Sequence, residues 1–167
     1  MSGKPPFDPQ PHLIGELLEV RPLRAGDLDA LYAVASDPLL WEQHRESDRH
    51  REDVFRRFFD AQLASGGGLA VIDRSDGRVV GTSRYDRYDA ERSEIEIGWT
   101  FLARTHWGGV ANGELKRLML AHAFGFVERV VFLVHPENVR SRRAVEKLGA
   151  VLVETREAAV VYELRAP

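Results

Sequence analysis

A glycine-containing loop between a predicted strand and a predicted helix is the segment of this sequence best suited to bind a charged ligand. Gly108 and Gly109 lie in this loop, and Gly113 lies near the start of the helix that we expect to follow. Unpaired backbone N–H groups at a helix start attract anions, and glycine lets the backbone approach a ligand closely. The loop therefore indicates either a phosphate site or a structural turn. Its spacing differs from that of a dinucleotide fingerprint, and the Gly-Lys-Ser/Thr of a P-loop is absent.

A second informative segment, residues 136–150, begins where an apolar strand is predicted to end. Asn138 can cap the helix that follows, and Ser141 comes one turn later. In order and spacing, these segments resemble the GNAT superfamily of N-acetyltransferases over about residues 16–164. The chain is most similar to the RimJ/RimL branch, the ribosomal-protein alanine acetyltransferases. The matching motifs are Arg21-Pro22-Leu23-Arg24, Asp27-Leu28, Ile95-Glu96-Ile97-Gly98-Trp99, Trp107-Gly108-Gly109, Asn138-x-x-Ser141 and Glu146-Lys147-Leu148-Gly149.

The resemblance implies a coenzyme A thioester as acyl donor, with acetyl-CoA expected and no metal. In this family two neighbouring strands splay apart in a V and hold the pantetheine arm, here 93–102 and 130–134. The loop N–H groups hold the pyrophosphate, and Arg143 on the next helix can reach the 3′-phosphate or serve as an ordinary surface charge. The implied cofactor-binding residues are Trp99, Thr100, Phe101, Leu102, Trp107, Gly108, Gly109, Val110, Ala111, Asn112, Gly113, Asn138, Ser141 and Arg143.

The sequence departs from the family pattern at two places. Val110 and Asn112 stand where the glycine loop of the family usually has small residues. Val145 stands where many relatives carry a tyrosine that protonates the departing thiolate. These departures motivate an alternative to an enzyme, a module that binds or senses acyl-CoA without turnover.

Two side chains are candidate catalytic groups, because amine acetylation needs an acceptor for the proton of the amine. Glu96 alternates to the strand face opposite Ile95 and Ile97, and it is our first candidate for the base. The alternative is that Glu94 and Glu96 form a solvated strand face. His135 follows the apolar run 130–134 and is either a second candidate or a structural histidine.

Aromatic residues are the candidates for the acceptor site. Trp41 begins a polar stretch that shapes acceptor specificity in relatives, and Tyr85 and Tyr88 follow a strand expected to flank that site. Each of the two tyrosines is equally suited to simple packing. The six histidines lack metal-ligand spacing with carboxylates, so no metal site is predicted.

Hydrophobic periodicity predicts the elements that must position these groups. Helical spacing appears from Leu28 to Ala35, from Arg51 to Ala64, from Asn112 to Val127 and from Asn138 to Gly149. Strands are predicted at 18–23, 69–72, 79–85, 93–102, 130–134, 151–154 and 160–164. The strand 93–102 alternates cleanly at first, which places Ile95, Ile97 and Trp99 on one face. The fold class is therefore α/β (mixed α+β) around one central sheet. The resemblance adds a largely antiparallel sheet, the V-shaped splay and about four flanking helices.

Length and composition exclude several classes of protein. The chain of 167 residues suits one domain, and we expect a flexible lead-in at 1–15 followed by a single acyltransferase domain at 16–167. A net charge of −3 offers no basic footprint for nucleic acid, and the absence of cysteine excludes a thiol relay. No apolar run reaches membrane-spanning length, so we expect a cytoplasmic protein without a membrane partner. Monomer and homodimer both remain open.

The functional hypothesis is therefore an N-acetyltransferase that moves an acetyl group from acetyl-CoA to a primary amine. The acceptor is a protein N-terminus or a small amine, and transfer is direct in a ternary complex. The absence of cysteine favours this route over a covalent intermediate on a thiol.

Overall fold

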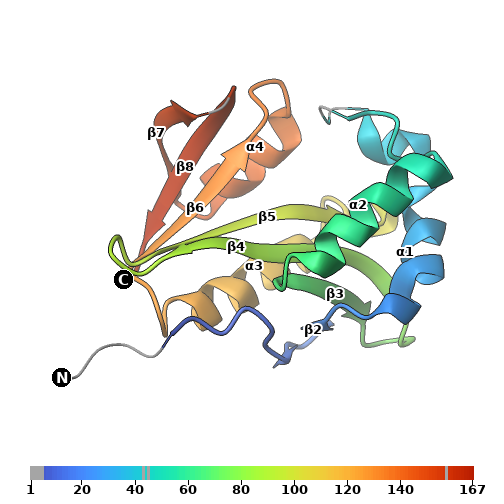
Figure 1. The fold of residues 1–167 in the computed structure, drawn as a ribbon, viewed down its shortest axis with the longest axis horizontal. Helices are drawn as coiled ribbons and strands as arrows, with labels where there is room; N and C mark the ends of the chain where they lie inside the picture. Colours follow the sequence, from blue (N-terminus) through green and yellow to red (C-terminus); the bar gives the residue numbers. More distant parts are fainter. Residues whose placement is uncertain (1–5, 43, 45, 157) are drawn as a thin grey trace.

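A computed structural model describes residues 6–42, 44, 46–156 and 158–167, and its fold is an eight-stranded sheet flanked by helices (Figure 1). All neighbouring strands are antiparallel except β5 and β6, and the strand order is β1-β2-β3-β4-β5-β6-β8-β7. The strands are β1 Leu13–Ile14, β2 Leu18–Pro22, β3 Gly68–Asp73, β4 Val79–Asp89, β5 Glu94–Leu102, β6 Arg129–Val134, β7 Val151–Arg156 and β8 Ala159–Arg165. The predicted fold class is confirmed.

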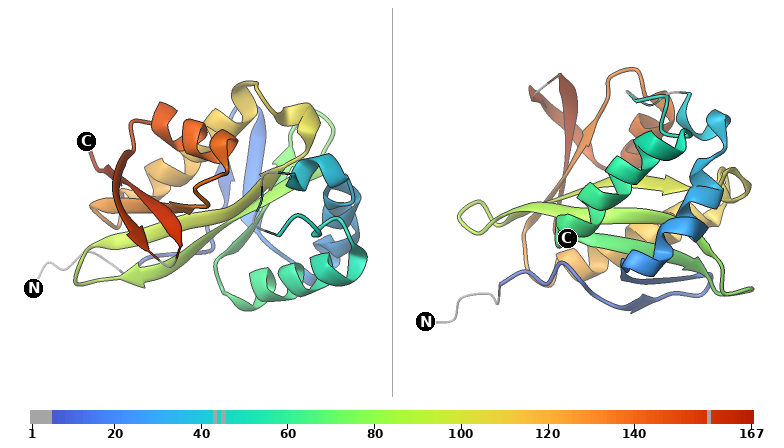
Figure 2. Two further views of the ribbon diagram at one scale, coloured as in Figure 1. Left: turned by 90° about the horizontal axis from the view of Figure 1, so that it is seen from above. Right: turned by 45° about the vertical axis from the view of Figure 1, so that its right-hand side comes forward.

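The α-helices of the described residues cover both faces of the sheet (Figure 2). They are α1 Leu28–Ala35, α2 Glu52–Ala64, α3 Val110–Ala123 and α4 Val139–Lys147. The described residues also form three short 3-10 helices. These are η1 Ala25–Asp27 before α1, η2 Pro38–Trp41 after α1 and η3 Arg104–His106 before α3. Strand alternation sorts the core into two clusters, because Leu69 and Val71 face α3 whereas Ala70 between them faces α1 and α2.

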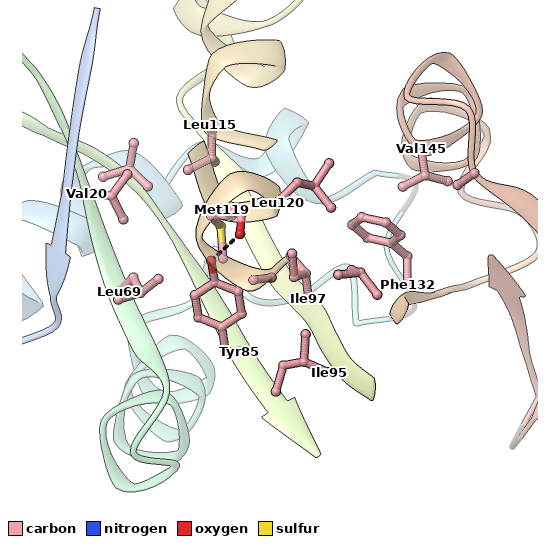
Figure 3. Close-up of a cluster of buried hydrophobic side chains, with 14 of the residues drawn as sticks. Val20, Leu69, Tyr85, Ile95, Ile97, Leu115, Met119, Leu120, Phe132 and Val145 are labelled. Carbon is pink, nitrogen blue, oxygen red and sulfur yellow. Dashed lines mark hydrogen bonds between the residues drawn. The ribbon is translucent and has the colours of Figure 1, made fainter. Parts of the chain in front are cut away.

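The larger core cluster fills the space between the sheet and α3 and continues toward α4 (Figure 3). Leu115 and Met119 from α3 pack there with Ile95 and Ile97 from β5, and all four are almost fully buried. Helical spacing on α3 and alternation on β5 bring these side chains to one layer. This layer supports β5, the strand that carries Glu96 and the predicted site residues 99–102.

The N-terminal segment packs against this core. Phe7 is buried, and its ring lies edge-on to Tyr85 at 4.9 Å between centroids. His122 Nε2 donates a hydrogen bond of 2.8 Å to the Asp8 carbonyl. The packed region therefore includes residues that the sequence assigned to the lead-in.

Two local features differ from the sequence prediction. Helix α3 begins at Val110, two residues before the predicted start, because the chain turns at Gly108, whose φ is +69°, and Gly109 is the N-cap residue. The prediction that Trp99 shares a face with Ile95 and Ile97 is wrong. Trp99 has a φ of +51°, and the register with β4 shifts there, so this strand contains a β-bulge.

Candidate active site

Strands β5 and β6 separate after a short paired stretch, and this separation opens the site. Their parallel pairing runs only from Glu94 opposite Arg129 to Glu96 opposite Val131. Beyond it β5 continues on β4, whereas β6 continues on β8. Figure 1 shows β6, β8 and β7 diverging from β5 beyond this point. The predicted V-shaped splay is therefore present, with its vertex at Glu96.

A cavity of about 850 Å³ lies in this splay, bounded by β5, β6, the glycine loop and the first turns of α3 and α4. It brings together residues that are far apart in the sequence, as predicted. The predicted site residues that line it are Trp41, Glu96, Trp99, Thr100, Phe101, Leu102, Trp107, Gly108, Gly109, Asn112, Gly113, His135, Asn138, Ser141 and Arg143.

The glycine loop forms one end of the cavity. The left-handed φ of Gly108 is a conformation that residues with a side chain rarely adopt, which explains glycine at this position. A Cβ placed on Gly108 or Gly109 would meet no atom within 4 Å, so the space in front of the loop is open. The N-cap residue Gly109 offers no side chain to the first-turn N–H groups of α3. These groups can therefore bind an anion.

Trp107 ties this loop to two other elements. Its indole Nε1 donates a hydrogen bond of 3.0 Å to the Leu102 carbonyl at the end of β5. The guanidinium carbon of Arg140, on α4, lies 3.5 Å from the centre of the Trp107 ring. This close cation–π geometry holds the first turn of α4 next to the loop.

Asn138 and Ser141 shape the opposite wall of the cavity. Asn138 is buried and caps α4, because its side-chain oxygen accepts a hydrogen bond of 3.2 Å from the Ser141 backbone N–H. This is the capping role that the sequence predicted. Arg143 is exposed on the same helix and also lines the cavity.

Glu96 lies at the vertex of the splay and is only 4% exposed. Its Oε1 has no hydrogen bond within the described part of the chain, and the nearest cation is Arg87 with Nε at 3.5 Å. Burial raises the pKa of Glu96 to about 7, although Arg87 opposes the shift. The solvated strand face considered from the sequence is therefore absent, because Glu94 is also buried. A carboxylate with this pKa can accept a proton near neutral pH.

The bulge at Trp99 reverses the faces of the second half of β5. Trp99 lies against the guanidinium of Arg84, 3.9 Å from the ring centre, on the side of the sheet that Glu96 faces. Phe101 joins the core beneath α1 and α2, while Thr100 turns toward α3. Glu96 and Thr100 consequently point to opposite sides of the sheet, whereas strict alternation would place them on the same side.

Lys116 is a cavity residue that the sequence reasoning missed. It lies on α3, is 6% exposed, and donates a hydrogen bond of 3.0 Å from Nζ to Thr100 Oγ1. Its ammonium lies 5.7 Å from the centre of the Phe132 ring on β6. Burial lowers the pKa of Lys116 to about 8. Its spacing could have indicated this position, because Lys116 is four residues from both Asn112 and Leu120 and so shares their helix face.

The cavity wall beside Phe101, at the end of β5 far from Glu96, is aromatic and carries nitrogen-rich side chains that were not predicted. Arg49 lies 4.6 Å above the Phe58 ring and 5.6 Å from the Trp41 ring. His44 packs edge-on against Trp41, and burial lowers the pKa of His44 to about 4, helped by Arg49 and Arg140. His44 is therefore neutral at physiological pH.

Some predicted site residues lie away from this cavity. Tyr85 belongs to the core on the α3 side, where its hydroxyl donates a hydrogen bond of 2.6 Å to the Met119 carbonyl (Figure 3). Tyr88 is 41% exposed and stacks on Phe7. Val110 and Ala111 line a second, smaller hollow on the other side of the α3 N-terminus.

His135, the second candidate catalytic group, lines the cavity directly after the end of β6. Its Nδ1 accepts a hydrogen bond of 3.3 Å from the Glu137 backbone N–H. This contact fixes the ring at the start of the loop that leads to Asn138. Among the described residues, no group of three or more histidines and carboxylates could hold a metal ion.

Comparison with known proteins gives a consistent result. The acetyltransferase (GNAT) domain model matches residues 18–151. The uncharacterized N-acetyltransferase p20 of Bacillus licheniformis is 27% identical over 147 residues, which cover 82% of this chain and 80% of that protein. No helix of the described residues is long and apolar enough to span a bilayer.

Solved structures show the same fold. A GCN5-related N-acetyltransferase from Brucella melitensis has a TM-score of 0.83 at 22% identity, with 99% of this chain and 82% of that chain covered. Mycobacterium smegmatis RimJ in complex with CoA-disulfide has a TM-score of 0.68 at 19% identity, with 89% and 82% covered.

Proposed function

The chain belongs to the GNAT family of acetyltransferases and is an acyltransferase, and from this premise we propose that it moves an acetyl group from acetyl-CoA to a primary amine. Transfer is direct, within a ternary complex of protein, donor and acceptor. Glu96 accepts the proton of the amine. The RimJ/RimL resemblance favours a protein N-terminus as the acceptor, and a small amine is the other choice.

The placement of Glu96 carries this proposal. A buried carboxyl group, with an oxygen that accepts no hydrogen bond, lies where two strands separate, at the wall of the 850 Å³ cavity. An isolated buried charge is destabilising, so a folded protein usually pairs it or neutralises it. At this position a carboxylate that exchanges a proton near pH 7 serves the chemistry of amine acetylation.

The donor fits the other end of the cavity. The open first turn of α3 and the glycine loop suit the pyrophosphate. The splay suits the pantetheine arm, and Asn138, Ser141 and Arg143 line the wall beside it. A structural neighbour, RimJ, was solved with CoA-disulfide bound, which supports a coenzyme A thioester as the donor for this fold.

The backbone of β5 supplies the groups that polarise the thioester carbonyl. From Ile97 onward, the edge of β5 that faces β6 has no ladder partner among the described residues. Backbone N–H groups on this edge can donate hydrogen bonds to an oxygen that gains negative charge. The neutral amine attacks the acyl carbon, the C–S bond breaks, and the proton of the amine passes to Glu96.

The proposal is tested by ligand binding followed by turnover. Acetyl-CoA at about 100 times its dissociation constant should stabilise the fold by roughly 2.7 kcal/mol, which thermal unfolding detects easily. CoA should act similarly, and ATP, which lacks the pantetheine arm, should give a smaller shift or none. An absence of any shift with acetyl-CoA would contradict the proposal.

Turnover is then measured with an acceptor panel of peptides that begin with Ala, Ser or Met, together with spermidine. Release of free CoA thiol and a mass gain of the acceptor are followed in parallel. Acetylation of at least one amine is the predicted result. Donor binding without acetylation of any acceptor would favour a module that only binds acyl-CoA.

A further inference from the structure

Lys116 is the buried titratable side chain of the cavity that the proposed reaction leaves without a role. It has no carboxylate partner within the described residues, and Thr100 Oγ1 is the acceptor of its hydrogen bond. Buried lysines are rare unless they are paired, because removing an ammonium from water is unfavourable. An unpaired lysine in a substrate cavity therefore points to a partner that arrives with the substrate.

The position of the ammonium identifies which part of the substrate it meets. Thr100 belongs to β5, and Phe132 is the first residue of β6 beyond the last pair with β5. The Lys116 Nζ lies near both, so it sits between the separated strands, close to the vertex. An acyl group near Glu96 at the vertex has its sulfur one bond further out, toward the open part of the splay.

The bulge at Trp99 places the two titratable groups on opposite sides of β5. Glu96 points to the side that α1 and α2 cover, whereas Thr100 and its partner Lys116 lie on the α3 side. In acyl transfer the amine approaches and the thiolate departs at different positions around the same carbon. A base on one side and an acid on the other match this requirement.

We propose that Lys116 is a catalytic residue that protonates the sulfur of the departing CoA thiolate. This inference rests on the proposed function, because it assigns a second proton transfer to the same reaction. Its buried amine, with a pKa near that of an ordinary thiol, is suited to share a proton with sulfur near neutral pH.

The two proton transfers balance. The amine nitrogen forms a bond to the acyl carbon, the C–S bond breaks, and its electron pair passes to sulfur. Glu96 takes a proton from the amine nitrogen, and the Lys116 ammonium gives one to sulfur, so CoA leaves as the neutral thiol. Glu96 then loses its proton to water, and Lys116 regains one from water, so one proton is released when the acceptor enters as an ammonium ion.

The test compares Lys116→Met and Lys116→Arg with the wild-type chain. Methionine keeps the length of the side chain and removes the amine, whereas arginine keeps a positive charge that is too basic to give up a proton easily. Single-turnover release of CoA is followed with the best acceptor of the panel, and acetyl-CoA affinity is measured by titration. Arg57→Met, on the exposed face of α2, is the matched control for the loss of one charge.

We expect Lys116→Met to slow the chemical step by about 100-fold, with acetyl-CoA affinity within threefold of wild type. Lys116→Arg should recover less than a tenth of the lost rate. A wild-type rate in Lys116→Met, a defect only in donor affinity, or full recovery in Lys116→Arg would each overturn the assignment. Thermal unfolding of each variant confirms that it is folded.

The same experiment separates this inference from the proposed function. If the wild-type chain binds acetyl-CoA but acetylates none of the acceptors, the proposed function fails and the inference fails with it. If the wild-type chain acetylates an amine and Lys116→Met is equally fast, only the role of Lys116 is overturned.

Discussion

Two buried carboxyl groups, Glu114 and Glu96, lie in very different surroundings. Glu114, the fifth residue of α3, accepts hydrogen bonds of 2.8–3.2 Å from the backbone N–H groups of residues 16–18. Glu96, at the vertex of the splay, has one ion pair at 3.5 Å and an oxygen without a hydrogen bond. The two residues are 8% and 4% exposed, so burial alone does not distinguish them.

The two carboxylates differ in the hydrogen-bond partners that the protein provides. The protein itself satisfies Glu114, which fastens the segment between β1 and β2 to the start of α3 and so supports the glycine loop. Glu96 Oε1 can still accept a hydrogen bond from a substrate. A satisfied buried charge is a structural device, whereas an unsatisfied one beside a cavity marks a candidate for chemistry.

The largest expected effect is on stability, at Glu114. Glu114→Ala leaves three buried or part-buried backbone N–H groups without their acceptor, and we expect the free energy of unfolding to fall by about 3 kcal/mol. Denaturant unfolding measures this change, with Glu128→Ala on the surface as the matched control. A loss below about 1 kcal/mol would show that other contacts hold this segment.

The next effect is on catalysis, at Glu96. Glu96→Gln keeps the size of the side chain and removes the base, so kcat/KM for the acceptor should fall by about 100-fold or more. Stability should not fall, because the substitution removes a buried charge rather than a satisfied one. Initial rates and thermal unfolding, with Glu128→Gln as control, measure both. A destabilised variant that keeps its activity would reverse the proposed roles of the two carboxylates.

Glu96 should also make stability depend on pH. The pKa of Glu96 is raised in the folded state from an ordinary value of 4.5 to about 7, so the folded chain holds this proton more tightly than the unfolded chain. Its contribution is therefore full below pH 4.5 and is lost as the pH rises through 7, by about 3 kcal/mol. Denaturant unfolding of the wild-type chain and Glu96→Gln across this range measures it. Parallel curves for the two proteins would contradict the raised pKa.

The smallest expected effect is a gain in stability at Lys116. The pKa of this lysine is lowered from 10.5 to about 8, so its burial is unfavourable below pH 8 and becomes neutral as the pH rises through 10.5. Lys116→Met should therefore raise the free energy of unfolding at pH 7 by about 1 kcal/mol. Denaturant unfolding at pH 7 and at pH 10 checks both the gain and its disappearance. A loss of stability would indicate a structural lysine.

Much of the fold could be predicted because its signals are local. The helical spacing of Val54, Phe55 and Phe59 and the apolar run of β6 depend only on nearby residues. Asn138 was predicted as a helix cap for the same reason. The two-residue strand β1 was not predicted, because it has no periodicity of its own and is defined by its pairing with β2.

The parts of the site that could not be predicted depend on contacts between distant segments. The bulge at Trp99 arises from the register between β4 and β5, and no residue type in the segment 95–99 predicts it. Tyr85 lies in the predicted strand, but its side chain faces α3 and its hydroxyl contacts Met119 there. Lys116 was missed because a lysine on a helix is usually solvated, and only the splay of β6 from β5 shows what it faces.

The pH dependence of kcat/KM for the acceptor tests the central claim most directly. Measurements between pH 5.5 and 8 on the wild-type chain, Glu96→Gln and His135→Gln separate the two candidate bases. If Glu96 is the base, the wild-type value rises with an apparent pKa of about 7, His135→Gln keeps this rise, and Glu96→Gln loses it along with most of the activity. A rise that persists unchanged in Glu96→Gln would contradict the account.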